Sequence, residues 1–515
     1  AHELASQAGL QILRKGGNAV DAAVAVGFAL AVVHPEAGNL GGGGYIVVRM
    51  ADGRARAIDY KETAPAAAVP GLYANPLESR VGYKASAVPG TVAGLAMAQK
   101  MFGSLPWKDV LEPAYRLARE GFPASQRMEL ILALQVPVMK DFADSAKVFL
   151  HGSNVPLKQS EILKQPDLAR TIRRLRQRGW REFYEGETAR LIDTDMRSHG
   201  GTITLADLKS YIAHDLPPLE GSYRGYKLLT IPPSSSGGIA LLEMLNVLET
   251  FSMPVGEEGS FRSRHLQVEA MRRAFRDRSE FAADPAFFPI PVDRLISKEH
   301  GREIAGGIQA DRATASASLG GPAVAESGRE SDDTTHFSVV DEAGNIVSNT
   351  YTLNGFYGSQ VIPKGTGVLM NDIMSGFSMT QGSRNEIGPG KRPVSSMTPV
   401  IALYPDGKPF VALGSPGSAT IPNTLLGTIV NLVDYKMSLR DAIEFPRIHH
   451  QFRPDRIESE PAAMVLDVVA RMLAAGHVVN PVTRSQGDVH AVGIASDGWR
   501  IGWSDGRRGG RAAGY

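Results

Sequence analysis

Two segments at the start of the chain have the hydrophobic pattern of adjacent helices. In residues 2–14, apolar side chains recur every three or four positions, which is the spacing of one helix face. A Lys-Gly-Gly run at 15–17 then provides a helix end. Residues 19–33 are small and apolar on nearly every side, and they follow Asn18, a residue type that caps helices. We therefore expect the second helix to be packed on both sides.

Strand patterns are clearest in the second half of the chain. Residues 335–340 alternate in side-chain character, and residues 346–353 are rich in β-branched and aromatic types, so the polar turn between them predicts a β-hairpin. The other main elements expected are strands at 45–50, 367–374, 400–404 and 409–413, and helices at 239–248, 265–281 and 421–433. Strand pairs followed by helices in both halves predict an α+β protein with layered sheets and helices outside.

Four consecutive glycines at 41–44 lie between a predicted helix and a predicted strand. A phosphate-binding loop would follow a strand and continue into Gly-Lys-Ser or Gly-Lys-Thr, and neither condition is met. Close packing of the backbone against a neighbouring segment is the favoured interpretation.

Composition removes several classes of function. The 515 residues contain no cysteine, which excludes disulfides, zinc thiolates and cysteine nucleophiles. The formal charge of +1 gives no field for a polyanion, so nucleic acid is not an expected partner. The longest apolar run, 22–33, is shorter than a membrane span, so no membrane association is expected. Since the sequence starts at Ala1 without Met, we expect that its beginning, with any signal peptide, is not included.

The predicted hairpin begins with a Thr-Thr pair whose first member, Thr334, is a candidate nucleophile. A polar segment at 325–333 precedes it and has the composition of an exposed, cleavable loop. Cleavage before Thr334 would free its α-amine, which titrates at about 7.7 to 8.0 and can accept the hydroxyl proton near neutral pH. Ordinary strand propensity also explains a Thr-Thr pair, and the local pattern alone favours that interpretation.

Two further local patterns could support chemistry. The strand-glycine-helix junction at 414–418 would present free backbone N–H groups at a helix N-terminus, where an oxyanion can be held. His265 and Glu269 lie one helical turn apart, which suits either a metal pair or a hydrogen-bonded histidine on a helix face. The second interpretation is favoured, and neither a metal nor another cofactor is expected.

Several long motifs resemble the γ-glutamyltranspeptidase family of N-terminal nucleophile hydrolases, in order and over nearly the whole chain. They are Gly-Gly-Asn-Ala-Val-Asp-Ala-Ala at 16–23, His-Pro-Glu-Ala-Gly at 34–38, the four glycines, Pro-Gly-Thr-Val-Ala-Gly at 89–94, Thr-Thr-His-Phe-Ser-Val-Val-Asp at 334–341, Arg-Pro-Val-Ser-Ser-Met at 392–397, Gly-Ser-Pro-Gly at 414–417 and Gly-Tyr at 514–515. The resemblance implies a four-layer αββα sandwich built from two autoprocessed fragments, 1–333 and 334–515, that form one intertwined domain.

The resemblance also implies the catalytic residues. The precursor is expected to cut itself between Asp333 and Thr334, whose hydroxyl then attacks substrate amides. Thr352 matches the family's second threonine, which hydrogen-bonds the nucleophile. Gly417 and Ser418 match the backbone donors of the oxyanion hole, although the family usually has a second glycine where Ser418 stands.

The expected acyl pocket departs from the family pattern. Ser395, Ser396 and Asn354 match residues that hold the α-carboxylate of a γ-glutamyl group, but the family's arginine is Lys61 here, which lacks the bidentate fork. The acidic pair that meets the α-ammonium has become Ser-Gly at 375–376.

The missing acid at Gly376 leaves a desolvated ammonium without a counter-charge. Asp372 is the candidate substitute, and the predicted strand around it does not settle the direction of its side chain.

The resemblance therefore implies an autoprocessing threonine amidohydrolase and acyltransferase, with γ-glutamyl amides such as glutathione as donors and water or an amine as acceptor. The alternative is a family member with another acyl preference, such as a glutaryl or other dicarboxylic monoamide, as in the cephalosporin-acylase-like members. Loss of the acidic pair favours that alternative. An unprocessed, non-enzymatic binding protein is the third interpretation. The family resemblance also implies a periplasmic or secreted location.

Overall fold

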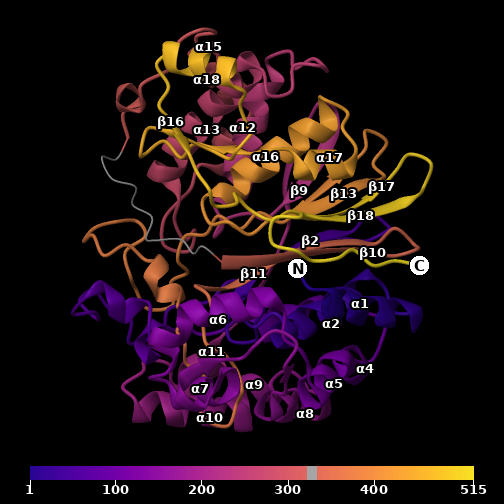
Figure 1. Ribbon diagram of the computed structural model, residues 1–515, viewed down its shortest axis with the longest axis vertical. Helices are drawn as coiled ribbons and strands as arrows, with labels where there is room; N and C mark the ends of the chain where they lie inside the picture. Colours follow the sequence, from indigo (N-terminus) through magenta and orange to yellow (C-terminus); the bar gives the residue numbers. More distant parts are fainter. Residues whose placement is uncertain (322–332) are drawn as a thin grey trace.

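The computed structural model describes residues 1–321 and 333–515, and these form four layers with two β-sheets face to face and helices on both outer sides (Figure 1). The first sheet has the order β10-β11-β1-β2-β7: Asp333–Val340, Ile346–Asn354, Gly43–Arg49, Ala55–Tyr60 and His214–Leu216. The second has the order β18-β17-β13-β12-β9-β8: Arg500–Ser504, His490–Ile494, Pro409–Gly414, Val400–Leu403, Tyr226–Thr230 and Leu219–Tyr223. The predicted αββα sandwich is confirmed.

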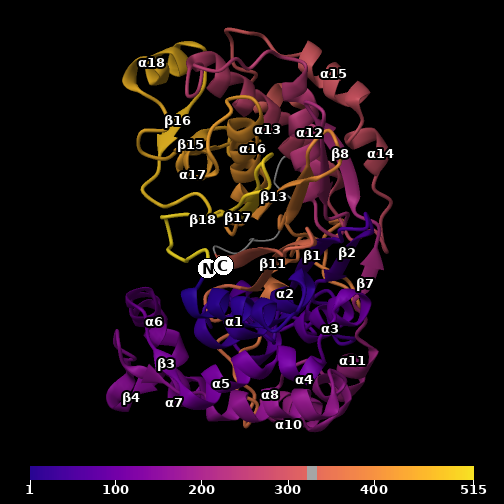
Figure 2. The same cartoon turned by 90° about the vertical axis from the view of Figure 1, so that its right-hand side faces the viewer.

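The helices divide into two outer layers that both views separate clearly (Figures 1 and 2). Below the first sheet lie α1 to α11: Glu3–Arg14, Ala19–Val33, Thr91–Phe102, Trp107–Val110, Glu112–Glu120, Gln126–Met139, Ala143–Phe149, Pro166–Arg178, Glu182–Glu185, Glu187–Ser198 and Leu205–Ser210. Above the second lie α12 to α18: Gly237–Glu249, Phe261–Phe281, Val292–Leu295, Lys298–Gly306, Thr420–Val433, Leu439–Glu444 and Leu466–Ala474.

Short strands outside the two main sheets complete the described part of the chain. They are β14, β15 and β16 (Ile448–His449, Ile457–Ser459 and Val479–Pro481), and the pairs β3 with β6 (Phe122–Pro123, Ile162–Leu163) and β4 with β5 (Leu150–His151, Val155–Pro156). Among the described helices, none has the length and apolar character needed to cross a membrane.

Side-chain alternation in β1 explains why the first sheet is buried on both faces. Ile46 and Val48 point into the core shared with α2, whereas Tyr45 and Val47 point into the core shared with the second sheet. All 15 residues of α2 are buried, as its all-round apolar pattern predicted.

Both main sheets combine strands from the two sides of residue 333. In the first sheet, β11 pairs with β10 on one edge and with β1 on the other. In the second sheet, β12 lies between β13 and β9. Each main sheet is therefore completed by strands from both sides of residue 333.

The four-glycine run has the packing role that was expected. A Cβ atom on Gly42 would lie 2.1 Å from the carbonyl oxygen of Thr352, and one on Gly44 would lie 2.4 Å from that of Thr350. Only glycine allows β11 to approach this closely. The run thus brings the backbone of β1 against the strand that carries Thr352.

The prediction of a strand at 367–374 is wrong. Met370 forms a single bridge with Gly41, and residues Ile373–Gly376 form a 3-10 turn instead. The side chain of Asn371 replaces a strand partner here, since it accepts from the N–H of Ala87 at 2.9 Å and donates to the carbonyl of Gly41 at 2.8 Å.

Asp21 is a buried carboxylate that joins the start of α2 to the loop after α3. Its two oxygens accept hydrogen bonds from the N–H of Asn18, the side chain of Gln99, both donors of Ser104 and the N–H of Leu105. We expect Asp21→Asn to lower the free energy of unfolding by roughly 2 to 4 kcal/mol, because an amide nitrogen would face these donors. Urea denaturation measures the difference.

The control for Asp21 is Asp52→Asn, which changes a carboxylate with 53% of its side chain exposed. Its effect should stay within about 0.5 kcal/mol. Equal stability of the Asp21 variant and the unchanged protein would contradict the structural role of this carboxylate.

Candidate active site

The hairpin β10–β11 places Thr334 and Thr352 next to the predicted cleavage bond. Asp333 pairs with Asn354 across the two strands, and the register shifts between Asp333 and Thr335, so the backbone is irregular at Thr334. The Thr352 hydroxyl donates to the carbonyl oxygen of Asp333 at 2.8 Å and accepts from the N–H of Asn354 at 2.8 Å. A hydroxyl fixed in this way polarises the carbonyl that precedes Thr334.

The side chain of Asp333 is buried beside two arginines. Its Oδ1 lies 3.1 Å from an Nη of Arg508 and 3.9 Å from an Nη of Arg127. Burial raises the pKa of this carboxyl to about 7, even though the arginines and His34 act in the opposite direction. The desolvation cost therefore exceeds the attraction of the neighbouring positive charges.

The loop after β13 approaches the hairpin and has an unusual backbone. Gly414 packs against the ring of His336, two residues after Thr334. Gly417 has φ +131°, and a Cβ there would lie 2.4 Å from the hydroxyl of Thr420, so the position requires glycine. Ser418 has φ +59°, which a serine tolerates.

The backbone N–H groups of Gly417 and Ser418 precede the first turn of α16. Within the described residues, neither group donates a hydrogen bond, while the carbonyl of Gly417 accepts two from Thr420. Two unpaired N–H groups at a helix N-terminus can stabilise a developing negative charge.

Lys61 is buried and its ammonium donates to the carboxylate of Glu62 at 2.7 Å. The other oxygen of Glu62 is buried without a hydrogen-bond partner in the described part of the chain. Sequence reasoning missed Glu62 because it considered only the position that matches the family's arginine. The adjacent acid in the Lys-Glu-Thr-Ala-Pro run was the available signal.

Asn354 connects the hairpin to the turn that contains Asp372, Ser375 and Gly376. Its amide donates to the carbonyl of Asp372 at 3.2 Å and to the hydroxyl of Ser375 at 3.0 Å. The carboxylate of Asp372 accepts from the N–H of Gly355 at 2.6 Å. Burial, with a smaller contribution from nearby Glu62, raises the pKa of Asp372 to about 7.

Ser395 and Ser396 lie on a loop that is anchored by Ser236. The carbonyl of Ser395 accepts from the N–H of Ser236 at 2.9 Å and from its hydroxyl at 2.8 Å. The hydroxyl of Ser396 is buried and has no partner among the described residues. The lining of a cavity next to this loop includes Val394, the neighbour of Ser395, and Ala419, the neighbour of Ser418.

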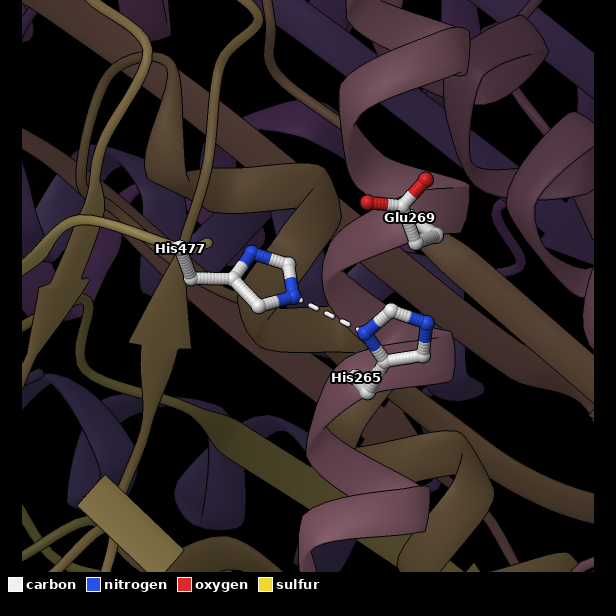
Figure 3. Close-up of side chains that lie close together, drawn as sticks. All are labelled: His265, Glu269 and His477. Carbon is white, nitrogen blue, oxygen red and sulfur yellow. Dashed lines mark hydrogen bonds between the residues drawn. The ribbon is translucent and has the colours of Figure 1, made fainter. Parts of the chain in front are cut away.

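His265, Glu269 and His477 are close enough to hold a metal, and Figure 3 shows them converging from α13 and the segment after α18. Hydrogen bonds made by the ring nitrogens of the two histidines account for this arrangement without an ion. His265 Nε2 must donate to the carbonyl of Gln309 at 2.6 Å, so its Nδ1 accepts from His477 at 2.8 Å. Two arginines, Arg272 and Arg273, contact Glu269.

A second cluster of possible metal ligands contains Glu243, Asp277 and His300. His300 Nε2 lies 2.9 Å from Asp277, and Arg276 contacts the other oxygen of Asp277 at 2.6 Å. Burial raises the pKa of Glu243 well above its ordinary value, which favours a neutral carboxyl beside the Asp277 carboxylate.

Comparisons with known proteins agree with one family over the whole chain. The family model described as gamma-glutamyltranspeptidase matches residues 5–515. The glutathione hydrolase proenzyme of Pseudomonas sp. (strain A14) is 40% identical over 91% of this chain and 83% of its own length. The acylase ACY 1 proenzyme of Pseudomonas sp. (strain V22) is 38% identical over 96% of this chain and 89% of its own length. The structure of cephalosporin acylase from Bacillus halodurans superposes with a TM-score of 0.88, at 26% identity, over 98% of this chain and 93% of its own.

Ionisation of the Asp372 side chain should make the free energy of unfolding depend on pH. Its pKa is raised from 3.8 to about 7, so between these values the unfolded chain loses the proton while the folded protein keeps it. Its contribution to stability is present below about pH 4 and is lost as the pH rises to 7. At pH 8 we expect the Asp372→Asn variant to have a higher free energy of unfolding than the unchanged protein. The difference should be up to about 4 kcal/mol, because one pKa unit corresponds to about 1.4 kcal/mol.

Thermal unfolding at pH 4, 6 and 8 measures this dependence, and the advantage of the variant should vanish at pH 4. The control Asp311→Asn changes an exposed carboxylate and should give no such trend. A difference that is the same at all three pH values would mean that Asp372 is ionised in the folded protein.

Proposed function

Since this chain belongs to the γ-glutamyltranspeptidase family and is an autoprocessed hydrolase and acyltransferase of that family, we propose that Thr334 is its nucleophile. The observation that carries the proposal is the hydrogen bond from Thr352 to the carbonyl oxygen of Asp333. It prepares one peptide bond for attack, namely the bond whose cleavage gives Thr334 a free α-amine.

The proposed self-cleavage begins with attack of the Thr334 hydroxyl oxygen on the carbonyl carbon of Asp333. The carbon–nitrogen bond breaks, and the nitrogen takes a proton and becomes the α-amine of Thr334. The resulting ester between Asp333 and Thr334 is hydrolysed by water. The products are the fragments 1–333 and 334–515, which remain one domain because each main sheet contains strands from both fragments.

The proposed reaction with substrate uses the same hydroxyl. The α-amine of Thr334 accepts the hydroxyl proton while the oxygen attacks the substrate amide, and the N–H groups of Gly417 and Ser418 stabilise the oxyanion. The amine then protonates the leaving nitrogen, which leaves an acyl ester on Thr334. Water or an acceptor amine attacks this ester, releases the acyl group and restores the hydroxyl.

We assign the acyl pocket to the surroundings of Ser396. Its buried hydroxyl lacks a partner in the described residues, and a substrate carboxylate would provide one. Ser395, Asn354 and Lys61 are the other proposed contacts. Because Lys61 is already paired with Glu62, its contribution to carboxylate binding depends on how that ion pair adjusts.

Glutathione-like γ-glutamyl amides are the proposed donors, in accord with relatives that are named glutathione hydrolases. The second candidate is a dicarboxylic monoamide such as a glutaryl amide, which has a carboxylate but no ammonium. Gly376 has no side chain to meet an ammonium, and the raised pKa of Asp372 leaves it partly neutral at pH 7. The relatives named as acylases agree with this candidate.

We also propose that the enzyme acts in the periplasm or outside the cell. This proposal rests on the family resemblance alone.

Thr334→Ala should abolish both self-cleavage and amidase activity, because alanine has no hydroxyl. A denaturing gel and N-terminal sequencing of the smaller fragment would detect the cut, and the unchanged protein should start a fragment at Thr334. Thr352→Val should slow cleavage by about 10- to 100-fold through loss of its hydrogen bond to the carbonyl.

The matched control is the neighbouring residue, with Thr335→Val expected to be cleaved normally. Cleavage or turnover by Thr334→Ala would assign the nucleophile elsewhere. A full-length band that persists in the unchanged protein would favour the non-enzymatic interpretation.

Gly376→Asp should raise turnover of a γ-glutamyl anilide by about tenfold or more, because it supplies an acid for the α-ammonium. The Cβ of the new side chain would lie 3.3 Å from the nearest atom, the Cβ of Pro393, so this proline must shift by a few tenths of an ångström to accept it. Anilide release by processed enzyme measures the effect, with a glutaryl anilide as the comparison. Turnover of the glutaryl compound should fall.

The control Gly388→Asp adds an acid outside the pocket and should change neither rate appreciably. High γ-glutamyl turnover in the unchanged enzyme, unaffected by Gly376→Asp, would show that another acid such as Glu62 already meets the ammonium.

A further inference from the structure

Three helices above the second sheet each bring one polar side chain to the same buried point (Figures 1 and 2). Glu243 lies on α12, Asp277 on α13 and His300 in the first turn of α15. Only 1%, 6% and 7% of these three residues are exposed to solvent. The ligand atoms that they offer lie within 4.8 Å of one another. One imidazole and two carboxylates form a donor set that suits a divalent transition metal.

Two buried atoms of this cluster lack hydrogen-bond partners among the described residues. Nε2 of His300 lies 2.9 Å from Oδ2 of Asp277, and this nitrogen carries the proton because a carboxylate only accepts. Nδ1 of the same ring is then an acceptor that no donor reaches. Oε1 of Glu243, 4.0 Å from Nε2, also has no partner. Hydrogen bonds within the described part of the chain therefore leave the cluster incomplete.

A cation between the three side chains would give both of these atoms a role. Oε1 of Glu243 would become a ligand, and Nε2 of His300 would become a ligand once its proton is carried by Nδ1. Nδ1 lies 3.6 Å from a carboxylate oxygen of Glu303, three residues further along α15. A histidine bound to a metal almost always donates its second N–H to a group of this kind.

The spacing of the ligand atoms suits a tetrahedral zinc ion. Zinc lies about 2.0 to 2.2 Å from nitrogen and carboxylate ligands, so two ligand atoms on its tetrahedron are about 3.3 to 3.6 Å apart. The distances from Nε2 of His300 to Asp277 and Glu243, 2.9 and 4.0 Å, lie on either side of this range. Arg276 contacts Oδ1 of Asp277 at 2.6 Å, which leaves Oδ2 for the ion.

A small cavity beside the cluster provides a fourth coordination position. Glu243 and Asp277 line it, together with apolar side chains that include Ile239 and Leu295. Its volume of about 20 Å³ is enough for one water molecule, which needs at least about 10 to 15 Å³. Three protein ligands and this water complete a tetrahedral zinc shell.

Contacts outside the cluster already hold the helices in this arrangement. Asn246, one turn after Glu243, donates to the carbonyl of Ile296 just before α15 at 2.7 Å. A Cβ atom on Gly301 would lie 2.7 Å from the Cβ of Asn246, so a glycine next to His300 is needed for α15 to lie this close to α12. The ligands are therefore brought together without an ion, which reduces the entropy cost of binding one.

The cluster of His265, Glu269 and His477 lacks these features (Figure 3). Both ring nitrogens of His265 already have hydrogen-bond partners. The guanidinium groups of Arg272 and Arg273 contact the carboxylate of Glu269, and their two positive charges oppose the binding of a cation. The same three kinds of ligand atom are thus occupied in one cluster and incomplete in the other.

We propose that Glu243, Asp277 and His300 bind one zinc ion, which joins α12, α13 and α15. Binding displaces the carboxyl proton of Glu243 into water and leaves the proton of His300 on Nδ1. The site uses none of the residues proposed for catalysis, so its role is to stabilise the fold. Local sequence patterns could not indicate it, because its ligands lie on three separate helices.

Zinc binding by the untagged full chain tests the proposal. Protein stripped with a chelator is dialysed against Zn²⁺ and its bound metal is measured by mass spectrometry. We expect one equivalent of zinc and a higher Tm with zinc than without it. Co²⁺ in place of zinc should give the visible absorption spectrum of a tetrahedral site.

Four variants locate the ion. Glu243→Gln and His300→Gln should each weaken zinc binding by about 100-fold or more, since even outer partners of a ligand contribute about 10- to 100-fold. Glu303→Gln, at a side chain that is 64% exposed, should weaken it by about tenfold. The matched control is His477→Gln in the other cluster, which should bind zinc as the unchanged protein does.

Failure of the unchanged protein to bind zinc would overturn the proposal and leave a proton shared between Glu243 and Asp277 as the content of the site. Equal affinities of the unchanged protein, Glu243→Gln and His300→Gln would place the metal elsewhere and overturn it too. If a ligand variant does not fold, the other measurements still decide. An octahedral Co²⁺ spectrum together with unchanged zinc affinity in Glu303→Gln would then contradict the site.

Discussion

The pairing of β11 with strands on both of its sides is the constraint on which the rest of the molecule depends. The strand carries Thr352 and Asn354, and it lies between β10, which begins at Asp333, and the glycine-rich start of β1. Every residue of β11 is buried, and a one-residue slip in its register would move each side chain to the opposite face of the sheet. The glycines at 41–44 allow the close approach, and the register then fixes the hydroxyl of Thr352 against the carbonyl of Asp333.

The elements that sequence predicted well are those whose pattern is local. Helix α2 has the predicted bounds because its composition and its Asn18 cap define both ends, and the hairpin was found from strand periodicity and turn composition. The segment 367–374 failed because the amide side chain of Asn371 occupies backbone partners that a strand would have used. The pattern of apolar residues along a sequence does not show that a side chain will take the place of a backbone hydrogen-bond partner.

Sequence motifs suggested which residues form the candidate site, but they gave no information on its ion pairs or on the pKa values of its carboxyl groups. Matching motifs identified Lys61, Asn354, Ser395 and Ser396, and all of them are buried. The ion pair between Lys61 and Glu62, the raised pKa of Asp372 and the position of Arg508 beside Asp333 all follow from burial and from contacts between distant segments. Sequence motifs do not encode these contacts, so the charges of the candidate site could not be predicted from them.

The ion pair between Asp333 and Arg508 joins residues that are far apart in the sequence. Arg508 is translated 175 residues after Asp333, and β12, β13, β17 and β18, which the second sheet needs, are translated in the same interval. A ribosome-bound chain that has just exposed Thr334 therefore has neither the surrounding sheets nor the arginine in place. The contacts that surround the Asp333–Thr334 bond can therefore form only after nearly the whole chain has been synthesised.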